Sequence, residues 1–234
     1  MNEKYKYAAI GFIGIVTGGF IVNLSSISEG LIGVVIGGLI TSLILWFKEY
    51  REQSSTQERN GRYAAIRIIT VLNEYLDKSV DIVSDDGTCH GRPAGQTKDG
   101  QEYYCPQARL PEPPTFPEDK DIDWQSIGFK NNELMYRILS LPNLARETDR
   151  YIEAASDNSF PPDNTELFEA RQEGYARLGL EAIELVEKLQ NEFKLSAPPR
   201  YQFWNEQWDT QRYLREKRDA IELKRKQGED NEHV

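Results

Sequence analysis

The sequence predicts an all-α protein in which an N-terminal two-helix transmembrane hairpin precedes a cytoplasmic domain, built like a helical bundle, that carries a long irregular loop. Three observations predict it: two long uncharged runs near the N-terminus, later apolar residues at spacings of three and four, and a proline-rich stretch without helical period. The expected divisions are the hairpin at 1–48, a juxtamembrane helical linker at 49–61, the helical domain at 62–226 with its irregular loop at 84–123, and a disordered tail at 227–234.

Two uncharged runs define the expected hairpin. Residues 7–28 and residues 30–47 contain no Asp, Glu, Lys or Arg. Helices rise about 1.5 Å per residue, so each run would nearly span a hydrocarbon layer of ~30 Å. Backbone groups in lipid must bond internally, which favours helices despite the glycines. A cleavable signal peptide is the alternative for the first run, although no small-x-small cleavage site follows it.

Basic residues near the ends of these runs predict the orientation. Lys4 and Lys6 precede the first run, and Lys48 and Arg51 follow the second. The expected turn between the two helices, residues 23–30, contains neither Lys nor Arg. Basic residues in short loops tend to stay on the cytoplasmic side. We therefore expect a multi-pass protein of the inner (plasma) membrane, with both termini cytoplasmic.

Glycines four residues apart mark candidate packing faces in both runs. Gly14 and Gly18 form one such pair, and Gly33 and Gly37 form the other. Small residues at this spacing let helix backbones approach closely in lipid. The packing partner is either the other helix of the hairpin or a second copy of the chain, and the second reading predicts a homo-oligomer.

Charge limits the partners of the remaining chain. The net charge is -10 and the mean hydropathy is -0.62. Residues 1–50 hold three basic and three acidic residues, so the whole excess of acid lies beyond them. An acidic domain is repelled by phosphate backbones, which argues against broad nucleic-acid binding. The expected partners are therefore the lipid bilayer, a second copy of the chain, and a protein or small ligand.

Apolar stripes predict helices in the later chain. One stripe lies between residues 69 and 83, and a longer one between residues 175 and 193; their members are Ile69, Leu72, Leu76, Val80 and Val83, then Tyr175, Leu178, Ala182, Leu185, Leu189 and Phe193. Asp163 and Glu166 have the spacing of a capping box at the start of the second helix. A further helical stretch is expected at residues 123–156, in which Pro142 should mark a boundary or a kink.

The proline-rich loop holds three chemically reactive side chains, Cys89, His90 and Cys105. Zinc usually takes four ligands at short recurring spacings, so this set is only a weak metal candidate and we predict no metal. Two reduced thiols are the preferred interpretation. A turn at Asp99 and Gly100 would form a small hairpin that sets Cys105 opposite Ala94.

Two tryptophans near the C-terminus are candidate partner contacts. Trp204 and Trp208 are one helical turn apart and precede a densely charged segment. Large aromatic side chains cap a helical core more often than they form a binding hot spot, and both interpretations stay open here.

No catalytic or cofactor motif occurs in the chain. It lacks a phosphate-binding P-loop, a dinucleotide-binding glycine pattern, HExxH and GxSxG. We therefore expect no enzyme and no cofactor, but a membrane-anchored binding or scaffold protein that holds its helical domain at the inner face of the membrane. The alternative is an oligomeric channel or lytic effector that its cytoplasmic domain gates.

Overall fold

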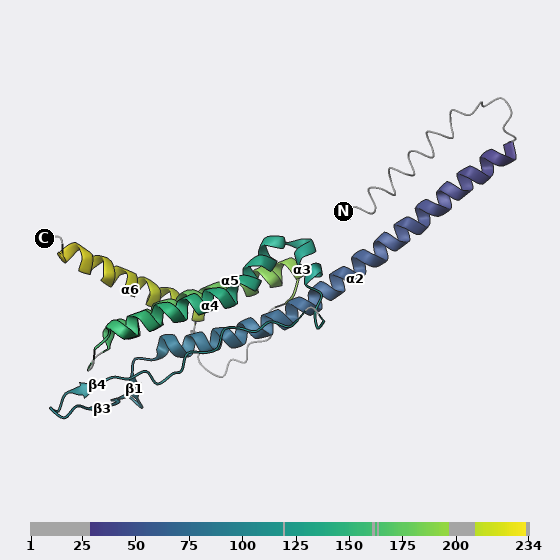
Figure 1. Cartoon of the computed structure of the whole chain (residues 1–234). Helices are drawn as coiled ribbons and strands as arrows, with labels where there is room; N and C mark the ends of the chain where they lie inside the picture. Colours follow the sequence, from purple (N-terminus) through teal and green to yellow (C-terminus); the bar gives the residue numbers. More distant parts are fainter. Residues whose placement is uncertain (1–28, 119, 161, 163, 197–208, 233–234) are drawn as a thin grey trace. The chain divides into compact units, whose positions relative to one another are not determined.

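A computed structural model provides the structure of the protein (Figure 1). It describes residues 29–118, 120–160, 162, 164–196 and 209–232, with side chains described from residue 37 to residue 227 of that part. The chain divides into two compact units, Met1–Ser55 and Thr56–Val234, which are described separately below.

The described part of the chain is predominantly helical, which confirms the all-α prediction. Its strands are two residues long and form two antiparallel pairs. The elements are the helices α2 (Glu29–Ser84), α3 (Trp124–Lys130), α4 (Asn132–Asn158), α5 (Thr165–Phe193) and α6 (Thr210–Glu232), and the strands β1 (Thr88–Cys89), β2 (Arg92–Pro93), β3 (Gly95–Gln96) and β4 (Glu102–Tyr103).

The predicted membrane spans are not supported. Among the residues that the structure describes, no helix is long and apolar enough to cross a membrane. The prediction of a multi-pass inner-membrane protein is therefore contradicted. The first predicted span, residues 7–28, lies outside the described residues.

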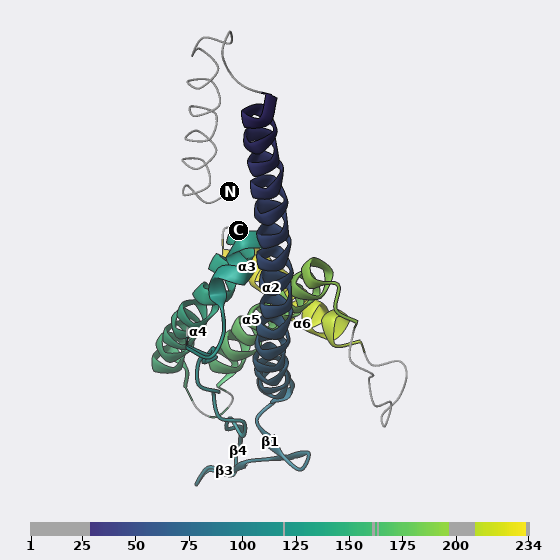
Figure 2. The ribbon, with the colours of Figure 1, turned by 90° about the vertical axis from the view of Figure 1, so that its right-hand side faces the viewer.

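The core of the second unit lies around α5. This helix contacts α4 along one side and α6 along another, so that it lies between them (Figure 2). The predicted stripe from Tyr175 to Phe193 is confirmed, because all six of its side chains are at most 2 % exposed. The α2 stripe is confirmed too: Ile69, Leu72 and Val83 are buried, and its other two members pack against the core.

Glycines permit close approach between helices of the second unit. A Cβ atom built on Gly179 of α5 would lie 2.8 Å from Leu214 Cδ1 of α6 and 3.4 Å from Leu76 Cδ1 of α2. Real Cβ contacts are almost never that short, so a side chain at this position would push the helices apart. Gly61 plays the same part between α2 and Phe193 of α5. Accordingly, α2 continues through Gly61, where the sequence left a break open.

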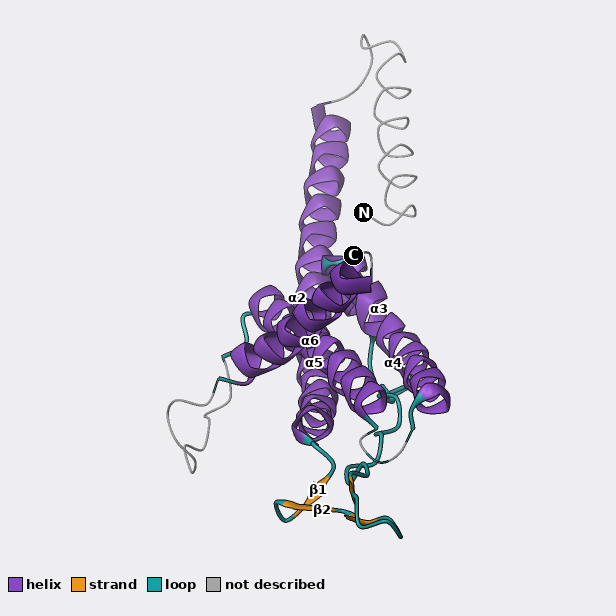
Figure 3. Ribbon diagram, turned by 90° about the vertical axis from the view of Figure 1, so that its left-hand side faces the viewer, coloured by secondary structure: helices purple, strands orange, loops and turns teal. Residues whose placement is uncertain are grey.

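The segment between α2 and α3 packs against the helical core and is hydrogen-bonded to α2. Two hairpins occupy its first half at one end of the unit (Figure 3). Its second half, residues 105–123, packs Leu110 and Phe116 against the core and ends where Arg67 Nη1 donates to the Asp121 carbonyl across 3.5 Å. The predicted irregular loop is thus a strap that covers part of the helical core.

The hairpin at Asp99 and Gly100 exists, but its register is one residue from the predicted one. Gly95 pairs with Tyr103, and Thr97 N donates to Gln101 O across 2.7 Å. Three residues therefore form the turn instead of two, with Gly100 at φ 82°. A third turn residue in the left-handed region is typical of such loops.

The ends of the helices also differ from the predictions. Helix α4 continues through Pro142, so of the two expected effects of this proline, an end or a kink, the end does not occur. Asn164, at φ 49°, stands at the N-cap position of α5 without a capping hydrogen bond from its side chain. Asp163 of the predicted capping box lies outside the described residues. Helix α6 extends to Glu232, into the expected disordered tail.

Candidate functional site

A hollow of about 380 Å³ lies where α4, α5 and α6 meet. We call it the three-helix groove. Its lining residues are Leu144, Glu147, Thr148 and Tyr151 from α4, Glu173, Gly174, Arg177 and Leu178 from α5, and Arg225 from α6.

Apolar side chains form the groove along two helical turns of α4. Leu144 and Tyr151 are seven residues apart and therefore lie on the same face of the helix. They remain 43 % and 46 % exposed, whereas Leu178 beneath them is 1 % exposed. Gly174 contributes no side chain, and a Cβ there would lie 2.5 Å from Thr148 Cγ2. Close approach of α4 and α5 therefore sets the depth of the groove.

The buried carboxylate of Glu173 binds two arginines at the rim of the three-helix groove. The side chain of Glu173 is only 5 % exposed, and it accepts hydrogen bonds from Arg177 Nη2 at 2.8 Å and from Arg225 Nη2 at 2.5 Å. Arg225 Nη2 also lies 3.3 Å from the Tyr151 hydroxyl oxygen, to which it donates. The hydrogen bond to Glu173 is the main cause of the raised pKa of Arg225. Both guanidinium groups thus lie at the mouth of the groove.

Three ion pairs fix α6 against α5 beside the groove. They join Glu173 to Arg225, Arg177 to Glu222 and Glu169 to Lys224. Leu214 and Ile221 of α6 are buried beneath them. In the first of these pairs the carboxylate of Glu173 is buried and the guanidinium of Arg225 is about half exposed, so Arg225 compensates a buried charge from the surface.

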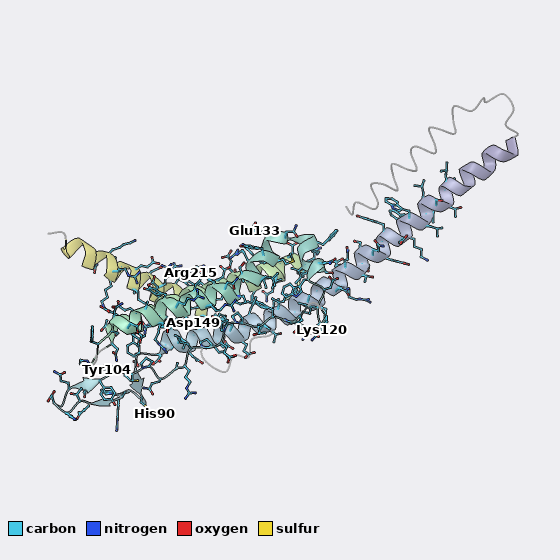
Figure 4. All side chains as sticks on the ribbon, viewed as in Figure 1. His90, Tyr104, Lys120, Glu133, Asp149 and Arg215 are labelled. Carbon is cyan, nitrogen blue, oxygen red and sulfur yellow. The ribbon has the colours of Figure 1, made fainter. Side chains whose placement is uncertain are left out.

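Buried polar contacts fix α4 against α5 on the other side. The Tyr175 hydroxyl donates to Asp149 Oδ1 across 2.8 Å. Burial raises the pKa of Tyr175 and of its neighbour Tyr75 on α2, and the nearby Asp149 raises both further. Asp149 lies among the helices in Figure 4, away from the hairpin residues His90 and Tyr104.

Charged side chains line two further hollows of about 370 Å³ each. Between α4 and α5, Arg137 forms ion pairs with Glu181 and Glu184 at 2.7 and 2.9 Å. Hydrogen bonds from Arg137 and then Lys188 lower the pKa of Glu184 to about 2. Among the described residues, no exposed large apolar side chain lines these two hollows, unlike the three-helix groove, which is therefore the stronger candidate.

In the described part of the chain no group of three His, Cys, Asp or Glu residues is arranged to hold a metal ion, and this includes the weak candidates Cys89, His90 and Cys105. Cys89 and Cys105 are exposed free thiols. His90 is in the left-handed region at φ 53°, followed by Gly91 at φ 73°. Two positive φ values at the centre of a two-residue hairpin are typical of a type I′ turn. The Cys-His-Gly-Arg stretch therefore forms a turn, which the sequence analysis missed.

Most of the remaining predicted site residues lie where the structure describes no side chain. Gly14, Gly18, Trp204 and Trp208 lie outside the described residues, and Gly33 belongs to the part of α2 whose surroundings are not described. A Cβ on Gly37 would meet no described atom within 4 Å, so no described residue of the chain packs against it.

Sequence reasoning also missed the residues that form the groove. Glu173 and Arg177 are an i,i+4 pair of the kind that we expected on a solvated helix face. The one sequence pattern that could have indicated the groove is the spacing of seven residues between Leu144 and Tyr151, which places both on one face of a helix. No family model, curated protein or solved structure matches the chain.

Proposed function

We propose that the chain is a non-enzymatic binding or scaffold protein whose helical domain captures an amphipathic helix of a protein partner in the three-helix groove. The observation that carries this proposal is the half-exposed pair Leu144 and Tyr151 above the apolar floor. The membrane-anchored form of this function and the channel alternative both depend on spanning helices, and we do not retain them.

The form of the groove favours a helix over a compact ligand. Leu144, Thr148 and Tyr151 follow each other at spacings of four and three, so the apolar surface extends along the axis of α4. Amphipathic helices bind such grooves through anchors at i, i+3 or i+4, and i+7. The lining carboxylate of Glu173 is engaged with two arginines, which supports binding without catalysis.

The rim predicts the charges of the partner. Exposed Glu147 lies on the α4 side, and Arg177 and Arg225, 57 % and 47 % exposed as side chains, lie on the side of α5 and α6. A complementary helix presents Leu to the groove, basic residues toward α4 and acidic residues toward α6. Such complementarity contributes chiefly to specificity and association rate.

A designed peptide tests the proposal with the full-length chain. The probe is an 18-residue amphipathic helix with leucine anchors, a lysine flank and a glutamate flank; the control peptide has the two flanks exchanged. We expect measurable binding of the first peptide and at least tenfold weaker binding of the second. Leu144→Asp should weaken the first peptide at least tenfold, whereas Tyr136→Ser, on α4 but outside the groove, should not. Equal affinities for the Leu144→Asp and Tyr136→Ser proteins, both with wild-type circular dichroism, would overturn the proposal.

A further inference from the structure

Arg177, at the rim of the three-helix groove, is shared between carboxylates of two helices. Its Nη2 atom donates to Glu173 Oε1 of α5 across 2.8 Å and to Glu222 Oε1 of α6 across 2.9 Å. The side chain of Arg177 is nevertheless 57 % exposed, so its guanidinium is open to a ligand in the groove. An acidic residue of a partner that approaches this rim therefore meets a guanidinium that already binds two carboxylates.

The two carboxylates differ in how readily they can release Arg177. The side chain of Glu173 is 5 % exposed, so loss of a donor would leave a buried charge poorly compensated. The side chain of Glu222 is 36 % exposed, and its Oε1 atom lies 4.0 Å from Arg218 Nε of the same helix. Water and Arg218 can therefore take the place of Arg177 beside Glu222. Of the two carboxylates, Glu222 is the one that a ligand can displace.

Helix α6 is held on α5 by contacts other than the one between Glu222 and Arg177. Ile221, the residue before Glu222, is 7 % exposed, and Leu214, seven residues earlier on the same face, is fully buried. Arg225 binds the buried carboxylate of Glu173 from the next turn of α6. Displacement of Glu222 therefore requires only a rotation of its side chain, while the helix stays in place.

We infer that Glu222 is an intramolecular competitor for the acidic flank of the partner helix, because its carboxylate occupies the place on Arg177 that an acidic residue of the partner would take. This autoinhibitory contact rests on the proposed function of the three-helix groove. Partly exposed ion pairs change an equilibrium by about two- to fivefold, and removal of the competitor should strengthen binding by that factor. A partner without an acidic residue at this position gains nothing from it, so the contact also contributes to specificity.

Titration of the full-length chain with the designed peptide tests this inference. We expect Glu222→Gln to bind the peptide that carries the glutamate flank about two- to fivefold more tightly than the wild type does. Glu216→Gln is the matched control, because the side chain of Glu216 is 69 % exposed and pairs with Arg212 of the same helix. It removes the same charge from α6 and should leave the affinity unchanged. A second peptide, with glutamine in place of each flanking glutamate, should bind both variants equally.

The outcomes separate this inference from the proposed function. Equal affinities of Glu222→Gln and Glu216→Gln for the first peptide would overturn the competitor role and leave the groove as a binding site. The same gain in affinity for both peptides would overturn it too, because a competitor of a carboxylate cannot affect a ligand without one. An absence of peptide binding by all three proteins would overturn the proposed function and this inference together.

Discussion

Arg171 Nη2 donates to Asp85 Oδ2 across 3.2 Å, and both side chains are at most 6 % exposed. The same Asp85 oxygen accepts from the backbone N–H groups of Gln107 and Ala108, each at 2.9 Å. One carboxylate therefore joins the end of α2, the start of the strap and α5. Burial lowers the pKa of Arg171, and the charge of Asp85 opposes that effect.

Replacing Asp85 should therefore destabilise the domain far more than replacing its neighbour. Asp85→Ala leaves a buried guanidinium and two backbone N–H groups without their acceptor, and we expect a loss of about 3–5 kcal/mol in the free energy of unfolding. Asp86 is exposed and accepts from Thr88 N, so Asp86→Ala should cost about 1 kcal/mol or less. Urea denaturation of the two variants measures the difference, and equal losses would contradict the role of Asp85.

The stripe of α5 gives a second prediction. Leu185 is fully buried, and Leu185→Ala should cost about 2–5 kcal/mol through lost burial and the cavity it leaves. Glu187 on the exposed side of the same helix is the control, and its replacement by alanine should change stability by about 0.5 kcal/mol at most. A loss below 1 kcal/mol at Leu185 in thermal or urea unfolding would show that the helix is not central to the core.

The contact between Gly174 and Thr148 predicts a coupling between two positions. Gly174→Ala gains about 1 kcal/mol of helix propensity but places a Cβ 2.5 Å from Thr148 Cγ2, a clash that costs about 1–3 kcal/mol. Thr148→Ser removes that methyl group. The double variant should therefore recover stability relative to the sum of the single variants, as a double-mutant cycle measures. Strict additivity would mean that α4 and α5 separate freely there.

The pH dependence of stability should show the ion pairs of Glu184. Its pKa falls from the ordinary 4.5 to about 2 in the folded chain, first because Arg137 donates to it and then because Lys188 does. An acid with a lowered folded pKa stabilises the folded state above its unfolded pKa and loses that contribution as the pH falls through the folded value. The stability difference between the wild type and Glu184→Gln should therefore shrink between about pH 4.5 and pH 2. The side chain is 49 % exposed, so salt should weaken the effect. A difference that is constant over this range would contradict the assignment.

Much of the helical domain could be predicted because helix periodicity is a local property. The members of the two stripes, from Ile69 to Val83 and from Tyr175 to Phe193, are buried or packed against the core as their spacing indicated. At Pro142 the sequence left an end or a kink of the helix open, and α4 continues through it. Pro142 has no backbone N–H to donate to the helical hydrogen-bond pattern. Leu141 and Ala145, both 1 % exposed, pack in the core and stabilise the helix around it.

The sequence by itself determined the all-α class, the two buried stripes and the position of a turn at Asp99 and Gly100, but not the length of that turn. Only the tertiary structure decided that Asp85 and Glu173 are buried, although adjacent or i,i+4 charges in an acidic chain usually lie in water. The physical reason is that a carboxylate can be buried only where other elements deliver its donors. Arg171 and the strap do so for Asp85, and Arg225 of α6 helps to do so for Glu173. The three-helix groove likewise exists only after α4, α5 and α6 have met, so no pattern within a single helix reveals it.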